Sequence, residues 1–423
     1  MNRWFRLASA AVAMIMIANL QYAWTLFVKP MIGAHADQHW KLSDVQWAFS
    51  IFIACQTWFM PASGWLIDRV GPRQFMTLGG LLCGAGWALL SQANSLPALY
   101  AFYAATGAGA ALVYCGSMGV ALKWFPDKRG LAAGITAAAF GSGTALFIPI
   151  IAHLLRSDGY RSTFVYTGLA QGFLIMCAAQ FLRSPQPGEV SAPAGAAKPK
   201  IRSRGEDFTP GQMMSTSHFY ILYLTMFIMG VGGLMVTAQL AKLAETFKIT
   251  AAALTLAASM NPIANGASRL FWGWVSDHMG RERTMVVAFL IQAVALTSVP
   301  LLAPGSDTFF ILCLALVYFS WGEIYVLFPS LAADIFGSRN ASANYGFLYS
   351  TKGVAAIVGG GLAAMLFEKT GSWSVVFYGG AVMALCSALM AVGLIKMPLP
   401  RKAHAPALSP AAAQGEAAQE YVQ

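Results

Sequence analysis

The sequence predicts an all-α membrane protein of twelve transmembrane helices, arranged as two pseudo-symmetric six-helix bundles. The first observation is composition: 57% of the 423 residues are hydrophobic and only 10% are charged, whereas soluble proteins carry about 25% charged residues. The second is a series of apolar runs of about 20 residues, the length that crosses a bilayer as a helix. The third is a motif that occurs at corresponding places in the two halves of the chain.

Twelve apolar runs define the predicted helices in order. They cover residues 7–31, 45–66, 74–94, 97–123, 131–154, 163–182, 219–241, 252–275, 284–303, 308–333, 345–367 and 373–396. The first run is expected to remain as a helix rather than act as a cleaved signal peptide. It is too long for one, and "NLQYAWTLF" lacks a cleavage site of small residues.

Lysine and arginine placement predicts the orientation of these helices. With both termini in the cytoplasm, 18 basic residues lie on the cytoplasmic side, 7 lie outside and 2 lie within spans. We therefore expect cytoplasmic termini in a cytoplasmic (inner) membrane, and this asymmetry explains most of the net charge of +10. No basic folded domain suited to nucleic acid is found. The expected partners are the lipid bilayer and a small solute, and a monomer is the default expectation.

The chain divides at residues 183–217, which are rich in Pro, Ala, Gly and basic residues and have no helical apolar period. Such a stretch is typical of a linker. We expect a six-helix bundle over 1–182, a cytoplasmic linker over 183–217, a second bundle over 218–396, and a disordered cytoplasmic tail over 397–423.

The repeated motif is "GWLIDRVGPR", starting at Gly64, and "GWVSDHMGRER", starting at Gly273, an offset of 209 residues. Glycine allows close helix approach, and Asp68 and Asp277 can accept hydrogen bonds from a neighbouring helix N-terminus or a basic loop residue. A single copy could be an ordinary basic turn, but duplication argues against chance. The residues singled out are Gly64, Asp68, Arg69, Gly71, Arg73, Gly273, Asp277, Gly280 and Arg281. The motif is similar to the signature loop of the major facilitator superfamily, whose fold is twelve helices in two bundles.

Two basic residues lie inside predicted spans. Arg269 lies 8 residues before Asp277 and Lys352 lies 8 residues after Asn344, so each is about 12 Å from the cytoplasmic end of its helix. A basic residue at this depth costs about 2.5–3.5 kcal/mol on insertion scales. Each could be structural, snorkelling or paired with a carbonyl, but two cations at one depth favour an anion site.

Several segments resemble the oxalate/formate antiporter family: "NRWF" at 2–5, "LQYAWTLF" at 20–27, "WFPDKRGLAAG" at 124–134, "FWGWVSDHMGR" at 271–281, "LFPSLAADIFG" at 327–337 and "NYGFLYSTKG" at 344–353. Taken singly, aromatic residues at this depth are more often core packing than ligand contacts. The resemblance nevertheless implies a substrate site in which Arg269 and Lys352 clamp a carboxylate. The aromatic walls that it implies are Tyr22, Tyr114, Trp321 and Tyr325, with Gln21 as a weaker polar contact.

Three positions depart from the oxalate exchangers. Phe140 replaces a tyrosine, Tyr349 replaces a tryptophan, and Glu323 replaces a small residue. Glu323 is expected to point away from Trp321 and Tyr325. It could be a structural partner of Lys352, or a charge-balancing or proton-carrying group. An ionised Glu323 would leave one net positive charge in the site, suited to a monocarboxylate, whereas without it two charges suit a dianion.

We therefore expect a secondary transporter of small carboxylates that works by alternating access, with oxalate/formate-type anion exchange foremost. Proton-coupled transport of lactate, pyruvate or formate is the alternative, and protons are then a further partner. A non-transporting carboxylate sensor is the alternative of another class. The sequence shows no nucleotide-binding glycine-rich loop, metal cluster or catalytic triad, so neither enzymatic chemistry nor a cofactor or metal is expected.

Overall fold

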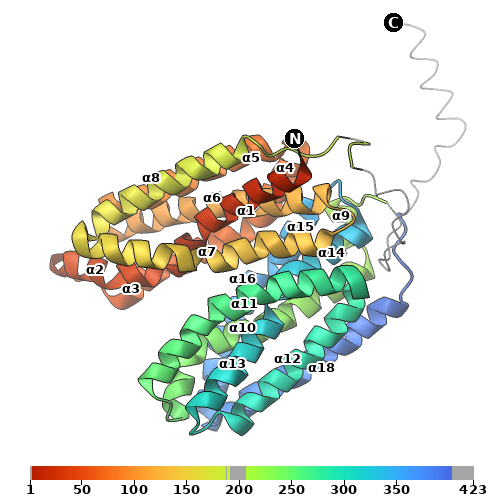
Figure 1. Ribbon diagram of the computed structural model, residues 1–423. Helices are drawn as coiled ribbons and strands as arrows, with labels where there is room; N and C mark the ends of the chain where they lie inside the picture. Colours follow the sequence, from red (N-terminus) through yellow and green to blue (C-terminus); the bar gives the residue numbers. More distant parts are fainter. Residues whose placement is uncertain (1, 187, 191–205, 403–423) are drawn as a thin grey trace, which may run out of the picture.

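The computed structural model describes residues 2–186, 188–190 and 206–402, which form helices joined by short loops (Figure 1). The first half contains α1 (Arg3–Tyr22), α2 (Trp24–Ala34), η1 (Ala36–Gln38), α3 (Leu42–Trp58), α4 (Met60–Val70), α5 (Pro72–Leu89), η2 (Leu90–Gln92), α6 (Leu96–Trp124), α7 (Arg129–Ser157) and α8 (Gly159–Ala179). The second contains α10 (Ser217–Thr246), α11 (Ala251–Met279), α12 (Arg281–Leu302), α13 (Asp307–Trp321), α14 (Ile324–Phe336), α15 (Ala341–Tyr349), α16 (Thr351–Ile357), η3 (Val358–Leu362), α17 (Ala363–Thr370) and α18 (Trp373–Lys396).

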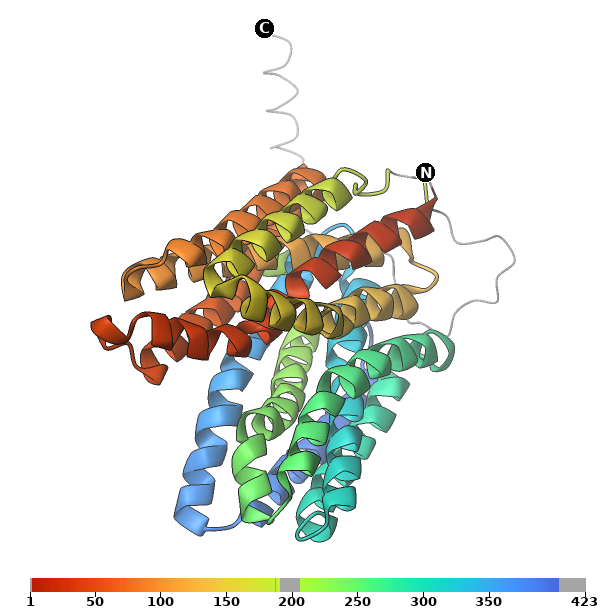
Figure 2. The same cartoon turned by 60° about the vertical axis from the view of Figure 1, so that its left-hand side comes forward.

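The helices form two groups that follow the two halves of the sequence. In Figure 1 most red-to-yellow helices lie above most green-to-blue ones, while α14 and α15 reach up to the first half, and Figure 2 shows the same separation from another side. The halves touch where α4 meets α15 and where α7 meets α11. These contacts place the two copies of the repeated motif at the boundary between the halves.

Ten helices in the described residues are long and apolar enough to cross a membrane. The other two predicted spans are helical as well. The span 45–66 is divided at Phe59 into α3 and α4, and the span 252–275 is the continuous helix α11, which is more polar because it carries Asn261, Asn265 and Arg269.

Four predicted spans are broken rather than continuous, which the apolar pattern did not predict. The breaks lie at Ala23, at Phe59, at Gly322 and Glu323, and at Ser350. At the last one, the hydroxyl groups of Ser350 and Thr351 donate to the carbonyl oxygens of Phe347 and Leu348 at 2.7 and 2.8 Å. Such bonds back to the preceding turn bend helices.

The breaks matter because they end helices at predicted site residues. Tyr22 is the last residue of α1, Trp321 the last of α13 and Tyr349 the last of α15. Interrupted helices surround the midplane binding sites of many transporters. The fold therefore brings three predicted site residues to helix ends inside the protein.

The end of the predicted linker is ordered against the second half. Residues 210–214 form the short helix α9 (Pro210–Met214), and the Phe208 ring is buried. The side chains of Asn340 and Asn344 donate to the Phe208 carbonyl oxygen at 2.9 and 3.1 Å. The middle of the linker and most of the predicted tail, 191–205 and 403–423, lie outside the described residues.

Candidate functional site

Arg269 lies on α11, deep between the two halves, with 2% of its surface exposed. Its Nε and Nη2 donate to Asn265 Oδ1 at 3.0 and 2.6 Å, and its Nη1 donates to the Ala137 carbonyl oxygen of α7 at 2.6 Å. These bonds account for three of the five N–H groups of a guanidinium. Arg269 is therefore held in one orientation by both halves and still has donors for an anion.

The Arg269 guanidinium also faces aromatic rings. Its Cζ lies 4.5 Å from the centroid of the Tyr325 ring, within the range of a cation–π contact. The Tyr22 hydroxyl interacts with it from α1. Tyr22 is 41% exposed, so part of its side chain is not covered by protein.

Lys352 is the second residue of α16, just after the break at Ser350, and is 7% exposed. Its Nζ donates to the Tyr349 hydroxyl at 3.1 Å, which uses one of three N–H groups. Lys352 and Arg269 are near enough to interact electrostatically. Both predicted cations thus lie in one region of the structure, where their mutual repulsion would favour an anion between them.

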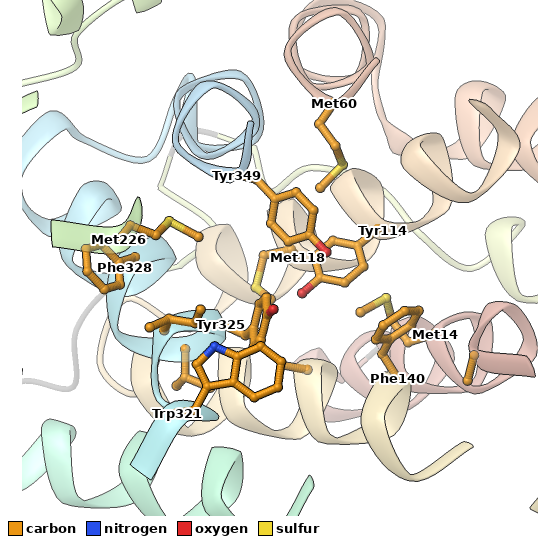
Figure 3. Packing of buried hydrophobic residues seen from close by; sticks show 14 of the residues in the cluster. Met14, Met60, Tyr114, Met118, Phe140, Met226, Trp321, Tyr325, Phe328 and Tyr349 are labelled. Atoms are coloured by element: carbon orange, nitrogen blue, oxygen red, sulfur yellow. The ribbon is translucent and has the colours of Figure 1, made fainter. Parts of the chain in front are cut away.

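The predicted aromatic residues gather around the same space, and Figure 3 shows five of these rings turned toward one another. The ring centroids are 5.0 Å apart for Tyr114 and Tyr349, 5.4 Å for Tyr114 and Phe140, and 5.7 Å for Tyr22 and Phe140. On the other side, Trp321 lies 5.8 Å from Tyr325, and Tyr325 lies 6.2 Å from Tyr349. Residues from six helices therefore form one cluster of aromatic rings, the box.

One predicted contact and one residue that was not singled out complete the surroundings. Gln21 has a buried Oε1 without a hydrogen-bond partner in the described chain. Tyr345, which was not singled out, lies 5.6 Å from Tyr349 and 6.5 Å from Tyr114 between ring centroids. Its position four residues before Tyr349 is the signal that could have identified it.

Glu323 forms no ion pair with either cation among the described residues. It is completely buried at the break between α13 and α14, and neither carboxyl oxygen has a hydrogen-bond partner among the described residues. The structural pairing of Glu323 with Lys352 is wrong, because no ion pair joins them there and Tyr349 receives the Lys352 hydrogen bond instead. A carboxyl group in such a place is costly to ionise.

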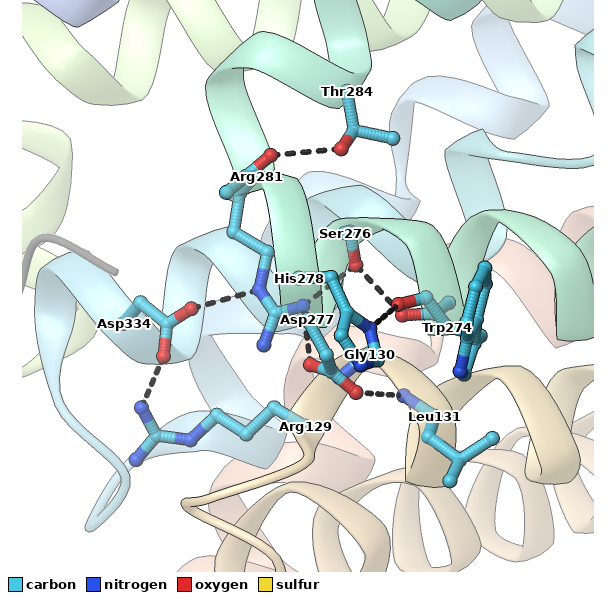
Figure 4. Close-up of polar contacts among 12 residues, drawn as sticks. Arg129, Gly130, Leu131, Trp274, Ser276, Asp277, His278, Arg281, Thr284 and Asp334 are labelled. Carbon is cyan, nitrogen blue, oxygen red and sulfur yellow. Dashed lines mark hydrogen bonds and ion pairs between the residues drawn. The ribbon is translucent and has the colours of Figure 1, made fainter. Parts of the chain in front are cut away.

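The repeated aspartates join the halves at the end that the basic residues predict to be cytoplasmic. Asp277 of α11 accepts hydrogen bonds from the backbone N–H groups of Gly130 and Leu131 at 2.9 and 2.8 Å, at the start of α7 (Figure 4). Asp68 of α4 accepts one from the Ala343 N–H of α15 at 2.8 Å. The positive end of a helix dipole favours a carboxylate. Each half therefore places an aspartate side chain at the N-terminus of a helix in the other half.

Basic residues strengthen these contacts. Arg281 pairs with Asp277 at 2.6 Å and with Asp334 at 3.0 Å, and Asp334 also pairs with Arg129 of the other half (Figure 4). Lys123 pairs with Asp68 at 2.6 Å. Asp334, Arg129 and Lys123 were not predicted, because their partners lie on distant parts of the chain.

The four glycines of the repeated motif have two different structural roles. A Cβ on Gly64 would lie 2.3 Å from the Ser342 carbonyl oxygen, and one on Gly273 would lie 2.3 Å from that of Gly130. These two allow the halves to touch. Gly71 and Gly280 instead end α4 and α11 with φ of 109° and 97°, a conformation that favours glycine.

Two arginines of the first motif stay within their own half. The Arg69 guanidinium lies 4.1 Å from the Trp65 ring centroid, and Arg73 Nε donates to Gln180 Oε1 at 2.8 Å. Their contacts therefore join neither copy of the motif to the opposite half.

Comparison with known proteins agrees with this architecture. The model of the Major Facilitator Superfamily matches residues 8–240 and 220–418. The oxalate:formate antiporter of Oxalobacter formigenes is 39% identical over 397 residues, which cover 93% of this chain and 92% of that protein.

More distant relatives have the same organisation. Monocarboxylate transporter 13 of Rattus norvegicus is 24% identical, with 88% of this chain and 84% of that protein covered. The crystal structure of the human organic anion transporter MFSD10 has a TM-score of 0.72 at 16% identity, covering 92% of this chain and 100% of that one. The chain is thus a multi-pass membrane protein with the major facilitator fold, and it belongs to the major facilitator superfamily and, within it, to the family of the oxalate:formate antiporter.

Proposed function

We propose that this protein exchanges small carboxylates across a cytoplasmic membrane, with oxalate and formate as its substrates. The observation that carries the proposal is the pair Arg269 and Lys352, buried together in an aromatic box and retaining free donors. The 39% identity to the oxalate:formate antiporter supports it. Oxalate carries two negative charges and formate one, so each can neutralise at least part of the positive charge of Arg269 and Lys352.

The charge of the site explains why exchange would be favoured over net transport. Two buried positive charges without an anion are costly in a membrane interior. A carrier that must bury them during its conformational change is more mobile with an anion bound. In this mechanism residues 1–182 and 218–396 rock about the site, and the cytoplasmic contacts of Asp68 and Asp277 break when the site opens inward.

Counterflow in proteoliposomes tests the proposal. Labelled oxalate should enter vesicles loaded with formate or oxalate much faster than empty vesicles. Unlabelled lactate and pyruvate should compete poorly. Equal uptake into empty and loaded vesicles would exclude obligatory exchange, and failure of both oxalate and formate to be transported would exclude the substrate assignment.

Glu323 favours a second candidate, proton-coupled transport of a monocarboxylate. Its carboxyl group is fully buried without a hydrogen-bond partner in the described chain, so it is a site at which a proton could be held. Monocarboxylate transporter 13 is a distant relative. Net uptake of lactate or pyruvate into empty vesicles, rising as external pH falls from 7.5 to 5.5, would support this candidate.

Glu323→Gln separates the two candidates. It retains shape and removes the titrating group, so it should abolish the pH response if Glu323 carries the proton. Unchanged substrate preference, exchange ratio and pH response would show that Glu323 is structural and favour plain exchange.

A further inference from the structure

Gly233 of α10 has a contact that distinguishes it from its neighbour. A Cβ built on Gly233 would lie 2.0, 2.2 and 2.3 Å from Cδ2, Cγ and Cε2 of Trp321. A Cβ on Gly232 would meet only Gln292 Nε2 at 3.3 Å and Leu296 Cδ1 at 3.5 Å. The Trp321 indole therefore occupies the space that a side chain at position 233 would fill.

The backbone conformation does not require glycine there. Gly233 lies inside α10 and is not among the residues with positive φ, and glycine inside a helix costs about 1 kcal/mol relative to alanine. The close approach of the indole is thus the structural reason for glycine at this position.

The indole cannot relieve such a contact by moving together with its helix. Its helix, α13, is held tightly against α11, because a Cβ on Gly322 would lie 2.0 Å from Ser268 Oγ and 2.7 Å from the Asn265 carbonyl oxygen. Tyr325 is a neighbouring ring of the box, with 5.8 Å between ring centroids. A side chain on Gly233 would therefore displace the indole relative to Tyr325 and the box rather than move α13 away.

We infer that Gly233 is a specificity-determining residue: by leaving room for Trp321, it sets the size of the anion that the box accepts. Carbon atoms in contact are separated by about 3.5–4.0 Å, so a methyl group at 233 requires the indole to move by about 1.5–2 Å. This inference rests on the proposed function, because it assumes that the box holds the transported carboxylate. The two-carbon oxalate should then lose more than the one-carbon formate.

Gly233→Ala tests the inference, with Gly232→Ala as the matched control. Both variants should be checked for thermal stability after purification, then assayed for oxalate and formate exchange in proteoliposomes. A misplacement of about 1 Å at an enzyme's reacting centre can cost about 100-fold in rate, and we take the same scale for the bound anion. We expect Gly233→Ala to lower oxalate exchange about 100-fold and formate exchange much less, while Gly232→Ala changes the ratio little.

A double-variant cycle assigns the effect to the indole. In the Trp321→Ala background the ring atoms that meet this Cβ are absent, so Gly233→Ala should cause little further loss, a non-additivity expected of residues in contact. Full additivity, or equal oxalate-to-formate ratios for Gly233→Ala and Gly232→Ala, would overturn the inference.

Trp321→Phe alone provides a measurement that does not require the alanine variant to fold. By enlarging the box it should raise exchange of the three-carbon malonate relative to oxalate. An unchanged malonate-to-oxalate ratio would overturn the role of Trp321 in size selection. If the parent exchanges neither oxalate nor formate, the proposed function fails. If the parent exchanges them and only the variants disagree, the inference alone fails.

Discussion

Arg269→Lys is the most informative single change, because it retains the positive charge and removes the planar fork. The guanidinium reaches the Ala137 carbonyl oxygen at 2.6 Å and Asn265 Oδ1 through two nitrogens at 2.6 and 3.0 Å. A single ammonium nitrogen cannot reach both partners and a carboxylate in the same arrangement. The change therefore separates charge from geometry.

The magnitude follows from these bonds. Hydrogen bonds to charged groups contribute about 1.5–3 kcal/mol each. Losing one such bond to the bound carboxylate would raise the half-saturation concentration for oxalate about ten- to 100-fold, since 1.4 kcal/mol corresponds to about tenfold. Arg269→Lys also loses the paired bonds to Asn265 that orient the guanidinium, which should raise the half-saturation concentration further.

The assay is oxalate counterflow into proteoliposomes that contain equal amounts of folded parent, Arg269→Lys or Arg156→Lys. Arg156 is exposed, at the end of α7, so its replacement should leave the half-saturation concentration unchanged. Parental rate and half-saturation for Arg269→Lys would refute the argument that the fork geometry matters. Arg269→Gln at the parental rate would refute the clamp itself.

Three further predictions concern the second cation, the cytoplasmic contacts and the topology. Lys352→Gln should abolish oxalate exchange in protein that still inserts, whereas Lys369→Gln, at an exposed position, should not; equal exchange by both variants would exclude Lys352 from the site. Asp277→Asn should weaken the bonds to the start of α7 and increase cytoplasmic labelling of an Ala343→Cys variant about tenfold, in a background without the six native cysteines; unchanged labelling would show that this contact does not hold the halves together. Tags at the N-terminus, in the linker 183–217 and at the C-terminus should be labelled only from the cytoplasmic side, and labelling of any of them on intact cells would contradict the predicted orientation.

The central cations were predictable because their depth depends only on helix geometry. Each residue advances a helix by about 1.5 Å, so equal spacing from the motif loop and from Asn344 predicted one depth for Arg269 and Lys352. The Asn265 contact follows from the same geometry, since residues four apart share a face. The Ala137 contact joins residues 132 positions apart, and no local pattern predicts such a pair.

The sequence by itself determined the membrane class, the division into halves and the repeated motif, because composition and helical spacing are local properties. Only the tertiary structure decided where helices break, that Glu323 forms no ion pair with either cation in the described chain, and that Gly233 leaves room for Trp321. These features depend on how side chains of separate helices fill a shared volume. Close packing makes that volume sensitive to a single methyl group, and a one-dimensional pattern of apolar residues carries no information about it.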